Sequence, residues 1–438
     1  MSSSTHIVVD LGFGDAGKGT MVDAIARRCS SPPFVVRHNG GAQAGHNVVT
    51  PDGRQHVFSQ FGAATFVPGA RTLLSKHFLL HPIGLVAEHE HLVSLGVTDA
   101  LDRLFVDERA LVITPFHQAM NRLREAARGP ARHGTCGLGI GETVSDSLLA
   151  EGEPIRASDL RDSSRLREKL VCVRNRKLRA VEALLPKLSP ANPDLALLRN
   201  PAAVEVTAQA FEDVGECLTY VTDEGAHGII KLSRHLIFEG AQGVLLDEWH
   251  GFHPHTTWST TTALNAENMI AEAGRTGPVT RLGVVRAYAT RHGQGPFPSE
   301  SLALTSILRD AHNGDDGWQG HFRCGWFDVP LTRYALACSP TIDALAVTCL
   351  DRLAEVPTWY VCDEHEGTPQ LRPSPSSWPA RSRLQHQEGL TRSLAKLMPR
   401  FVRVPNDPEG YLRALRERLQ IPIAVASFGP TAEDKRWL

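Results

Sequence analysis

The sequence predicts an α/β fold with a largely parallel central sheet flanked by helices. Short β-type runs alternate with helical patterns along most of the 438 residues, which is typical of sheets built from strand–helix units. A glycine-rich turn, Gly12–Gly19, stands between the first predicted strand and the first predicted helix, where parallel α/β proteins bind phosphate. The composition, 42% hydrophobic and 21% charged, is ordinary for a globular protein.

Strands are predicted where short apolar or β-branched runs lie between turn residues. In chain order they are Ile7–Val9, Phe34–Arg37, Thr72–Ser75, Leu104–Val106, Leu236–Glu239, Leu282–Ala287, Ala344–Thr348, Thr358–Cys362 and Ile423–Ser427. Helices are predicted where apolar residues recur with the helical period. In chain order they are Lys18–Arg28, Pro82–Leu95, Phe116–Ala127, Leu166–Leu185, Val204–Cys217, Thr261–Ala273, Pro330–Cys338 and Pro408–Leu419. Pro- and Ser-rich residues 367–383 are predicted to form a surface loop.

Composition also limits the class of protein. No repeat and no clear linker divides the chain, so we expect one elaborated domain over residues 1–438. A net charge of −2 argues against a surface that coats nucleic acid, and no apolar run is long enough to span a membrane. Eight cysteines without a C-x-x-C pair, and no secretory signal, favour a reducing, cytoplasmic compartment.

The first glycine-rich loop, Gly12–Thr20, fits the phosphate-loop pattern G-x-x-x-x-G-K up to Lys18. Backbone N–H groups at such a turn bind phosphate, and a lysine adds a positive charge. The next residue is Gly19, so the hydroxyl that usually holds Mg²⁺ is missing, while a carboxylate, Asp15, lies inside the loop. We therefore expect a loop that binds phosphate and also carries a base.

Two further glycine-rich segments follow. In Arg37–His46, three glycines let the backbone approach a ligand closely, and His46 ends the turn where it could meet the first loop. An isolated histidine is more often structural, but the glycine-rich context favours a role in the site. The segment Gly134–Gly141 is either a second phosphate cradle or only a tight loop.

Later segments add polar groups at predicted strand ends. Gln242, flanked by glycines, ends one strand at the carboxyl edge of the sheet, where α/β proteins bind ligands. The hydroxyl-rich run Thr256–Thr262 is either a helix N-cap or a phosphate contact. Thr290–Pro298 is predicted to be a rigid turn after a strand. Asp351 follows another strand, and a carboxylate there can accept two N–H bonds from guanine.

Taken together, these segments resemble adenylosuccinate synthetases, in order and over nearly the whole chain. The family loop G-D-E-G-K-G-K corresponds to Gly14–Thr20, and E-G-A-Q-G-x-x-L-D stands intact at Glu239–Asp247. The motif T-R-x-G-x-G-P-F-P stands intact at Thr290–Pro298. The remaining matches are G-G-x-N-A-G-H at Gly40–His46, G-T-T-G-x-G-I-G-P at Gly134–Glu142, H-G-x-x-P-x-x-T at His250–Thr257, C-G-W-F-D at Cys324–Asp328, T-K-L-D at Thr348–Asp351 and S-x-G-P at Ser427–Pro430.

The resemblance implies a GTP-dependent ligase of purine biosynthesis. GTP would phosphorylate the 6-oxygen of inosine monophosphate, and the amine of aspartate would then displace the phosphate and form a C–N bond. Asp15 would take the N1 proton, while His46 and Lys18 would stabilise charge on the transferring phosphoryl group. Gln242 would bind the purine. Asp15 and the carbonyl of Gly45 would ligate Mg²⁺.

The resemblance also implies the binding residues and the partners. The residues that would bind GTP are Gly14, Gly17, Gly19, Thr20, Gly45, Asp351, Ser427 and Gly429. The residues that would bind the purine nucleotide or the amino acid are Gln43, Thr135, Gln242, Thr257 and Arg323. The expected partners are GTP, a purine nucleotide or analogue, and an amino acid, with neither nucleic acid nor membrane. A homodimer is expected from the family.

The departures from the family are concentrated in substrate recognition. On the phosphate side, Gln43 stands for Asn, Leu138 for Arg, and residues 147–151 lack the Lys and Arg of the family. In the amino-acid loop, residues 317–326, only Arg323 remains of three arginines that would clamp the carboxylates of aspartate. Phe322 replaces one of them and Gly320 another, which suggests a less acidic or larger amine.

Three hypotheses therefore stay open. The chain is a divergent adenylosuccinate synthetase with rebuilt anion contacts. Alternatively, it is a paralogue in specialised metabolism, with the same GTP-driven activation but a different oxo-substrate or amine. The third hypothesis is a nucleotide-binding regulator without ligase activity.

Overall fold

Strands and helices alternate along the chain, and about half of the strands join one large sheet. The computed structural model describes residues 3–438 except 151–152, 309–317, 319 and 368–370. The strands are β1 (Ser4–Asp10), β2 (Phe34–Arg37), β3 (His46–Val49), β4 (Gln55–Phe58), β5 (Arg71–Leu74), β6 (Leu79–Leu80), β7 (Leu104–Asp107), β8 (Leu111–Val112), β9 (Thr219–Val221), β10 (His235–Gly243), β11 (Val279–Arg286), β12 (Ala289–His292), β13 (Phe322–Gly325), β14 (Phe327–Asp328), β15 (Ala344–Thr348), β16 (Tyr360–Glu366), β17 (Met398–Arg403), β18 (Ile423–Ser427) and β19 (Lys435–Trp437).

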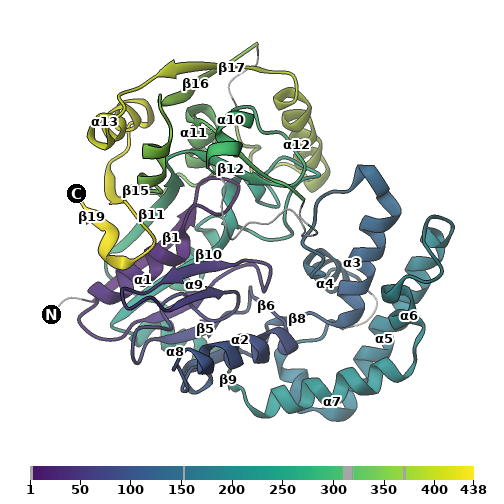
Figure 1. Cartoon of the computed structure of the whole chain (residues 1–438). Coiled ribbons are helices and arrows are strands. Elements are labelled where there is room, and N and C mark those ends of the chain that lie inside the picture. The colour runs from purple at the N-terminus through teal and green to yellow at the C-terminus, as the bar shows by residue number, and fades with distance from the viewer. Residues whose placement is uncertain (1–2, 151–152, 309–317, 319, 368–370) are drawn as a thin grey trace.

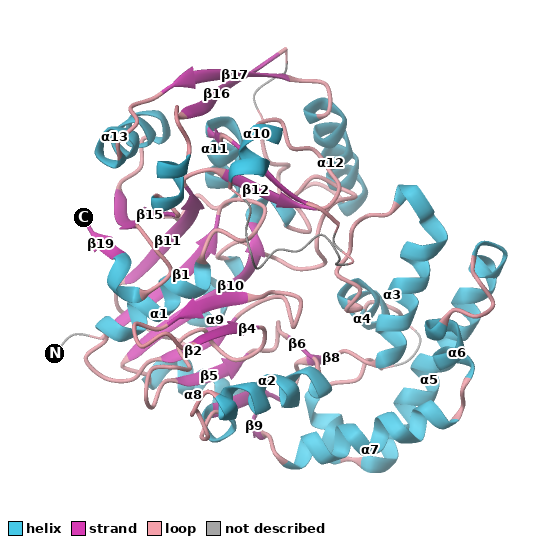
Figure 2. Cartoon of the chain, viewed as in Figure 1, coloured by secondary structure: helices cyan, strands magenta, loops and turns pink. Residues whose placement is uncertain are grey.

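Helices cover both faces of this sheet (Figure 2). They are α1 (Lys18–Arg28), α2 (Pro82–Ser94), α3 (Pro115–Arg128), α4 (Ile140–Ser147), α5 (Ser163–Val181), α6 (Pro193–Arg199), α7 (Ala202–Glu216), α8 (Asp223–Leu232), α9 (Leu264–Glu272), α10 (Leu302–Ile307), α11 (Val329–Cys338), α12 (Ala380–Leu394) and α13 (Pro408–Leu419). None of the described helices is both long enough and apolar enough to cross a membrane.

The main sheet has ten strands in the order β19-β18-β15-β11-β1-β10-β2-β5-β7-β9. Every neighbouring pair is parallel except the edge pair β18–β19, which confirms the predicted fold class. β1 lies between β10 and β11, and later strands extend the sheet on both sides of it. Ligands of open α/β sheets bind at the carboxyl ends of strands, near the place where the strand order reverses, and β1 lies at the centre of this sheet.

The two faces of the sheet pack against two separate cores, because successive side chains of a strand point to opposite faces. In β1, Ile7 and Val9 join one core, while Val8 joins the other. The first core includes side chains of α8, α9, α11 and α13. The second includes side chains of α1, α2, α3, α5 and α7. Burial on both faces explains why these strands are nearly continuous apolar runs.

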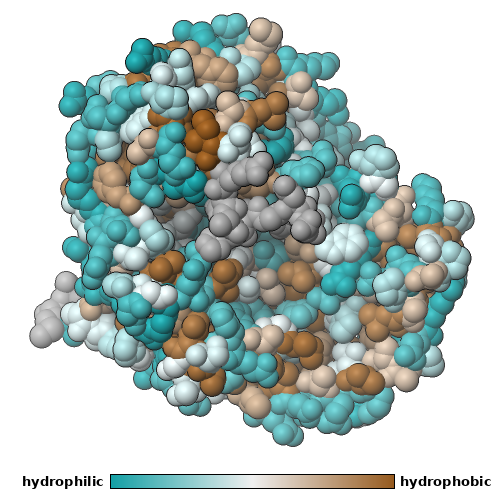
Figure 3. Space-filling view, in the orientation of Figure 1, coloured by the Kyte–Doolittle hydropathy of each residue, from teal (hydrophilic) through white to brown (hydrophobic). Residues whose placement is uncertain are grey.

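The helices α3 to α7 gather at one end of the molecule, away from α13 (Figure 1). On the face seen in Figure 3, hydrophobic residues lie scattered among hydrophilic ones rather than in one wide patch.

Several predicted elements are confirmed residue for residue: the strands Phe34–Arg37, Ala344–Thr348 and Ile423–Ser427, and the helices Lys18–Arg28 and Pro408–Leu419. The other predicted strands and most of the other helices agree to within a few residues at their ends. Whether the chain forms one domain stays a prediction.

Three predicted boundaries are wrong. The helix predicted from Thr261 begins at Leu264, because the Thr261 N–H donates to Asp247 (2.6 Å) and is tied into a loop. The helix predicted to reach Leu185 ends at Val181 and continues as a 3₁₀ turn that contains Pro186. Helix α12 begins at Ala380, inside the predicted loop 367–383, of which residues 368–370 lie outside the described part.

Candidate functional site

The glycine-rich loop after β1 is held by a carboxylate that the sequence analysis did not single out. Asp10, the last residue of β1, accepts hydrogen bonds from the backbone N–H groups of Gly12 (2.7 Å) and Ala16 (3.0 Å). It also forms a buried ion pair with Lys18 (2.8 Å). Asp10 therefore holds the loop against the end of β1. Lys18, which is predicted to face phosphate, is ion-paired with Asp10.

The same loop brings three predicted residues into unusual backbone conformations. Gly14, Asp15 and Gly17 have positive φ values of 96°, 58° and 87°, and Gly17 is the N-cap of α1. Only Asp15 carries a side chain there, and such a conformation costs on the order of 1–3 kcal/mol when it persists. Strain of this kind at a loop that opens a helix is typical of a functional position.

Asp15 is held by a histidine from another segment. Its Oδ2 lies 2.8 Å from Nε2 of His292, at the end of β12. Loss of solvation raises the pKa of Asp15, but this hydrogen bond and the charges of His292, Arg286 and Lys18 outweigh that effect, so the pKa lies below its ordinary value. Asp15 is therefore a carboxylate at neutral pH.

His46 is paired with Glu239, a fully buried residue in the middle of β10. His46 Nδ1 donates a short hydrogen bond to Glu239 Oε1, and the Ala63 N–H donates to the other oxygen (2.9 Å). Burial lowers the pKa of His46 despite the nearby carboxylate, so the ring is neutral at pH 7. Its Nε2 is buried without a hydrogen-bond partner among the described residues, which leaves that atom for a ligand.

A tight approach joins His46 to the start of α1. A Cβ placed on Gly19 would lie 2.7 Å from the Cβ of His46 and 3.1 Å from its backbone carbon. No side chain other than hydrogen fits there without moving the histidine. The structure therefore brings Lys18 and Gly19 of the first loop close to His46 of the second segment.

Asn39 and Ser259 join the second segment to the one that carries Gln242. Asn39 exchanges two hydrogen bonds with the backbone of Ala241 (2.7 and 3.1 Å), and Ser259 Oγ accepts from the Gly40 N–H (3.0 Å). The Gln242 backbone has a positive φ of 61°. In the part of the chain that the structure describes, Gln242 Oε1 is a buried atom without a partner.

Gln43 shows the same feature, because both polar atoms of its side chain are buried and unpartnered in the described structure. Buried amides normally form hydrogen bonds, and unpaired ones cost about 1–3 kcal/mol each. The two glutamines therefore offer groups that a polar ligand could satisfy.

The predicted substrate residues Thr135 and Thr257 lie in loops held by other elements. Thr135 Oγ1 accepts from Asn121 of α3 (3.0 Å), and its N–H donates to Glu125 (3.3 Å). The Thr257 N–H donates to the carbonyl of Leu246 (2.8 Å), which places it beside the segment of Gln242.

Arg323 is already occupied. Its guanidinium forms an ion pair with Glu300 (2.7 Å) and donates to the carbonyls of Gly293 (2.7 Å) and Gly295 (3.1 Å). The adjacent Phe322 packs against the His292 ring, with centroids 5.0 Å apart. Of the amino-acid loop, residues 317 and 319 lie outside the described part.

The predicted guanine side lies at the ends of β15 and β18. Asp351 is exposed, while the buried Ser427 hydroxyl donates to the carbonyl of Gly429 (3.2 Å). Lys435 of β19 donates to the carbonyls of Gly429 (2.7 Å) and Thr431 (2.8 Å), and burial lowers its pKa to about 8. Thr20 of α1 donates to the carbonyl of Pro430 (2.7 Å), which joins this turn to the phosphate loop.

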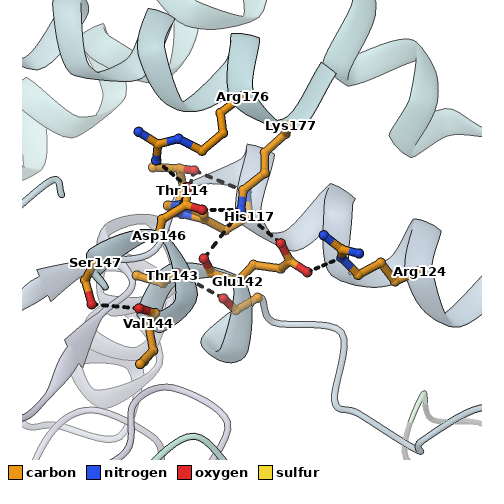
Figure 4. A network of polar contacts seen from close by, with 11 residues as sticks. Thr114, His117, Arg124, Glu142, Thr143, Val144, Asp146, Ser147, Arg176 and Lys177 are labelled. Atoms are coloured by element: carbon orange, nitrogen blue, oxygen red, sulfur yellow. Dashed lines mark hydrogen bonds and ion pairs between the residues drawn. The ribbon is translucent and has the colours of Figure 1, made fainter. Parts of the chain in front are cut away.

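The segment after Gly139, where the family's cations are missing, is held by a buried ionic network (Figure 4). Lys177 of α5 contacts both Asp146 (2.7 Å) and Glu142 (2.9 Å) of α4. His117 of α3 donates to Asp146 (3.3 Å), and Arg176 also reaches it (2.9 Å). These basic side chains come from α5 and α3, and they are already paired with carboxylates of α4. Residues 151–152 lie outside the described part.

The groups that could hold a metal ion differ in chemistry. Asp328, Cys362 and His365 converge in the interior, but Asp328 already caps α11 through Leu331 (2.9 Å) and pairs with His365 (3.0 Å). A thiol and an imidazole are poor ligands for Mg²⁺, which prefers oxygen. The Asp15 carboxylate and the exposed carbonyl region of Gly45 offer oxygen atoms, so they fit Mg²⁺ better.

Sequence reasoning missed Asp10, Glu239 and His292 as parts of the site. Asp10 ends β1, and Glu239 ends the strand predicted over Leu236–Glu239. A carboxylate at the end of an apolar run and next to a glycine-rich segment is a signal that could have found them. His292 stands at a variable position of its motif, and only the packing of β12 brings it to Asp15.

Comparisons with known proteins agree with this architecture. The family model for adenylosuccinate synthetase matches residues 7–436. The adenylosuccinate synthetase of Syntrophobacter fumaroxidans is 32% identical over 445 residues, covering 98% of this chain and 97% of the relative. That of Cyanothece sp. PCC 7425 is 33% identical over 447 residues, covering 97% and 92%.

Solved structures share the fold. The fully ligated adenylosuccinate synthetase of Plasmodium falciparum has a TM-score of 0.77 at 21% identity, covering 99% of this chain and 100% of that one. The succinoaminodeoxyadenylate synthetase PurZ of cyanophage S-2L, bound to dGMP and to dATP as energy donor, has a TM-score of 0.56 at 15% identity, covering 100% and 96%.

Proposed function

The chain belongs to the adenylosuccinate synthetase family, and from that premise we propose that it is a GTP-dependent ligase that forms a C–N bond on an oxo-purine nucleotide. The 6-oxygen of inosine monophosphate or a related oxo-purine would accept the γ-phosphoryl group of GTP. The amine of an amino acid, aspartate in the family, would then displace the phosphate.

One observation carries the proposal: an ionised carboxylate and a neutral histidine stand on adjoining glycine-rich turns, each oriented by a partner. Asp15 is oriented by His292, and His46 by Glu239. A carboxylate can accept the N1 proton of the purine. The Nε2 of His46 has no partner among the described residues, and once the ring takes up a proton this atom can donate a hydrogen bond to a phosphoryl oxygen.

The unpaired amides of Gln242 and Gln43 support a purine site between these turns. Gln242 would bind the base, Thr257 and Thr135 the nucleotide phosphate, and Asp351 the guanine of GTP. The turn Ser427–Pro430 and the N-terminal end of α1 would hold the GTP side, since Thr20 of α1 already bonds to the carbonyl of Pro430. The backbone of Gly14, Gly17 and Gly19 would face its phosphates.

Magnesium fits the oxygen donors of this site. Asp15 and the carbonyl of Gly45 would hold the ion, which supplies positive charge to the phosphates of GTP when bound. Lys18 is tied to Asp10, so its contribution would be a fixed positive charge under the loop.

The occupied Arg323 favours a second candidate, an amine other than aspartate. An arginine that clamps a carboxylate uses its N–H groups, yet the two terminal nitrogens of Arg323 already contact Glu300 and two carbonyls, and its Nε, which has no partner among the described residues, is buried. Phe322 and Gly320 add no charge. The S-2L PurZ protein, bound to dGMP and dATP, supports the idea that this fold accommodates other purines and energy donors.

The test is GTP-dependent phosphate release by the purified protein with inosine monophosphate and Mg²⁺, with each amino acid added separately and the products identified by mass. Asp15→Asn is the inactive reference. Adenylosuccinate formed only with aspartate would support the family reaction. A different adduct would support the second candidate.

Nucleotide binding without phosphate release, for every amine and for inosine, guanosine and deoxyguanosine monophosphates, would overturn both and leave a regulator. ATP in place of GTP measures the preference for the guanine. A homodimer and a cytoplasmic location are further proposals from family membership, and light scattering of the purified protein tests the first.

A further inference from the structure

The contact between Asp15 and His292 joins the phosphate loop to the segment that would hold the amine. Asp15 Oδ2 lies 2.8 Å from His292 Nε2, and the two side chains are 36% and 22% exposed. Both face the site rather than the core. Oδ2 of the carboxylate therefore accepts a hydrogen bond before any substrate arrives, which favours Oδ1 as the atom that accepts a proton, while the second lone pair of Oδ2 remains for a metal ion.

His292 is itself held from both sides. In the hairpin β12–β13, His292 is the register partner of Phe322, whose ring lies 5.0 Å from the imidazole at 54°. The next residue, Gly293, donates its N–H to the carbonyl of His321 (3.1 Å) and accepts from Arg323 (2.7 Å). The imidazole is thus placed by the hairpin and not by the phosphate loop.

Charged groups surround the pair. Arg286 approaches Asp15 from β11, and Lys18 approaches from α1, although Asp10 already neutralises the lysine. An imidazole that donates from Nε2 orients the carboxylate and favours its charged form, which can accept a proton.

We propose that His292 is a positioning residue for the ligase reaction: it donates a hydrogen bond from Nε2 to Oδ2 of Asp15, so that Oδ1 faces the N1 proton of the purine. Phe322 holds the imidazole in that place. This role explains why the amino-acid loop has an aromatic residue, since Phe322 packs against His292, the hydrogen-bond partner of Asp15. This inference rests on the proposed role of Asp15.

The experiment compares His292→Leu with His292→Gln. Leucine keeps the bulk and removes the donor, so kcat should fall roughly 10-fold to 100-fold, because misplaced catalytic groups cost about that much. The acid limb of the kcat profile should move to higher pH, because Asp15 loses a bond that favours its charged form. Glutamine keeps a neutral donor and should restore most of kcat and the wild-type profile.

Two further variants serve as controls. Phe322→Leu should give a smaller loss of kcat, because the imidazole keeps its donor but loses a packing partner. His227→Leu removes a histidine of α8 that contacts Asp223 (3.3 Å) outside the site, and it should leave both kcat and the pH profile unchanged. The KM for GTP should stay the same in all four variants.

A measurement without substrate separates this inference from the proposed function. In urea unfolding, the losses of stability in Asp15→Asn and His292→Leu should be non-additive in the double variant. Additive losses, or an active enzyme whose His292→Leu variant keeps wild-type kcat and pH profile, would overturn the role of His292. If the wild-type protein forms no product at all, the proposed function fails instead, and non-additive unfolding still supports the pair.

Discussion

At the scale of single residues, His46 depends on a carboxylate that never needs to touch a ligand. Glu239 is fully buried and binds His46 on one oxygen and the Ala63 N–H on the other. This pairing keeps the proton of the neutral His46 ring on Nδ1, so that Nε2 is a hydrogen-bond acceptor. Nε2 becomes a donor when the ring is protonated. The role resembles that of the buried carboxylates that orient histidines in other enzymes.

Glu239→Gln should therefore lower kcat by roughly 10-fold to 100-fold with little loss of stability, because the amide can still accept from Ala63 but no longer fixes the charge next to His46. The pKa of His46 should fall further, since Glu239 raises it at present. Steady-state kinetics and imidazole NMR measure both effects. Glu272→Gln, at an ion pair outside the site, is the matched control, and equal kinetics for the two variants would contradict the prediction.

Gly19→Ala tests the close approach between α1 and His46. A methyl group there lies 2.7 Å from the Cβ of His46, so we expect a loss of about 1–3 kcal/mol in unfolding free energy together with a fall in kcat. Gly228→Ala in α8 is the control, because its Cβ would meet nothing within 4 Å. That variant should be slightly more stable, by about 0.5–1 kcal/mol. Two equally stable, equally active variants would show that the histidine can move.

At the scale of elements, the sequence predicts the main sheet well and the small sheets poorly. Strands such as Ala344–Thr348 are buried on both faces, so their apolar runs are unmistakable. The hairpin of β12 and β13 has mixed residues, because one side faces the site. The helix boundary at Leu264 depends on Asp247, which accepts a hydrogen bond from the Thr261 N–H. The periodicity of apolar residues carries no information about such a contact.

The same distinction holds for the candidate site. Motifs place the glycine-rich turns, Asp15, His46 and Gln242 at strand ends, and the structure brings their segments together. Arg323 is a residue whose surroundings the motifs do not predict, because its partner Glu300 comes from another segment, 23 residues earlier in the chain. Pairing between side chains from different segments follows from tertiary packing, which residue patterns do not encode.

The position of α4 depends on the buried network with α5 and α3. Lys177→Met would leave the carboxylates of Asp146 and Glu142 short of a positive partner in the interior, at a cost of about 3–5 kcal/mol. Arg124→Met, which removes the exposed partner of the same Glu142 (2.6 Å), should cost less than about 1 kcal/mol. Urea unfolding of both variants measures the contrast, and similar losses would contradict it.

At the scale of the whole molecule, stability should fall on acidification. Burial lowers the pKa of His38 to about 3, and that of His77 and His250 to about 4. These groups are neutral in the folded state and take up protons on unfolding below their ordinary pKa of 6.5. The unfolded state then binds more protons, so stability is lost as the pH falls from about 6.5 towards 4.

Urea unfolding at pH 7, 5.5 and 4.5 measures this loss, which we expect to be on the order of 1–3 kcal/mol for each such histidine. His77→Gln should reduce this pH dependence by about the contribution of one histidine. A free energy of unfolding that is constant over this range would contradict the burial of these rings in neutral form.

The central place of β1 in the sheet has a consequence for how the protein is made. Ser4 meets His235 across 231 positions of sequence, and β11 lies further on still. At ordinary rates of translation, the first strand waits on the order of tens of seconds for its neighbours to be synthesised. During that interval a nearly continuous apolar segment has no sheet to join. The nascent chain is thus a natural client for ribosome-associated chaperones, and slowing translation should reduce the yield of native protein when those chaperones are absent.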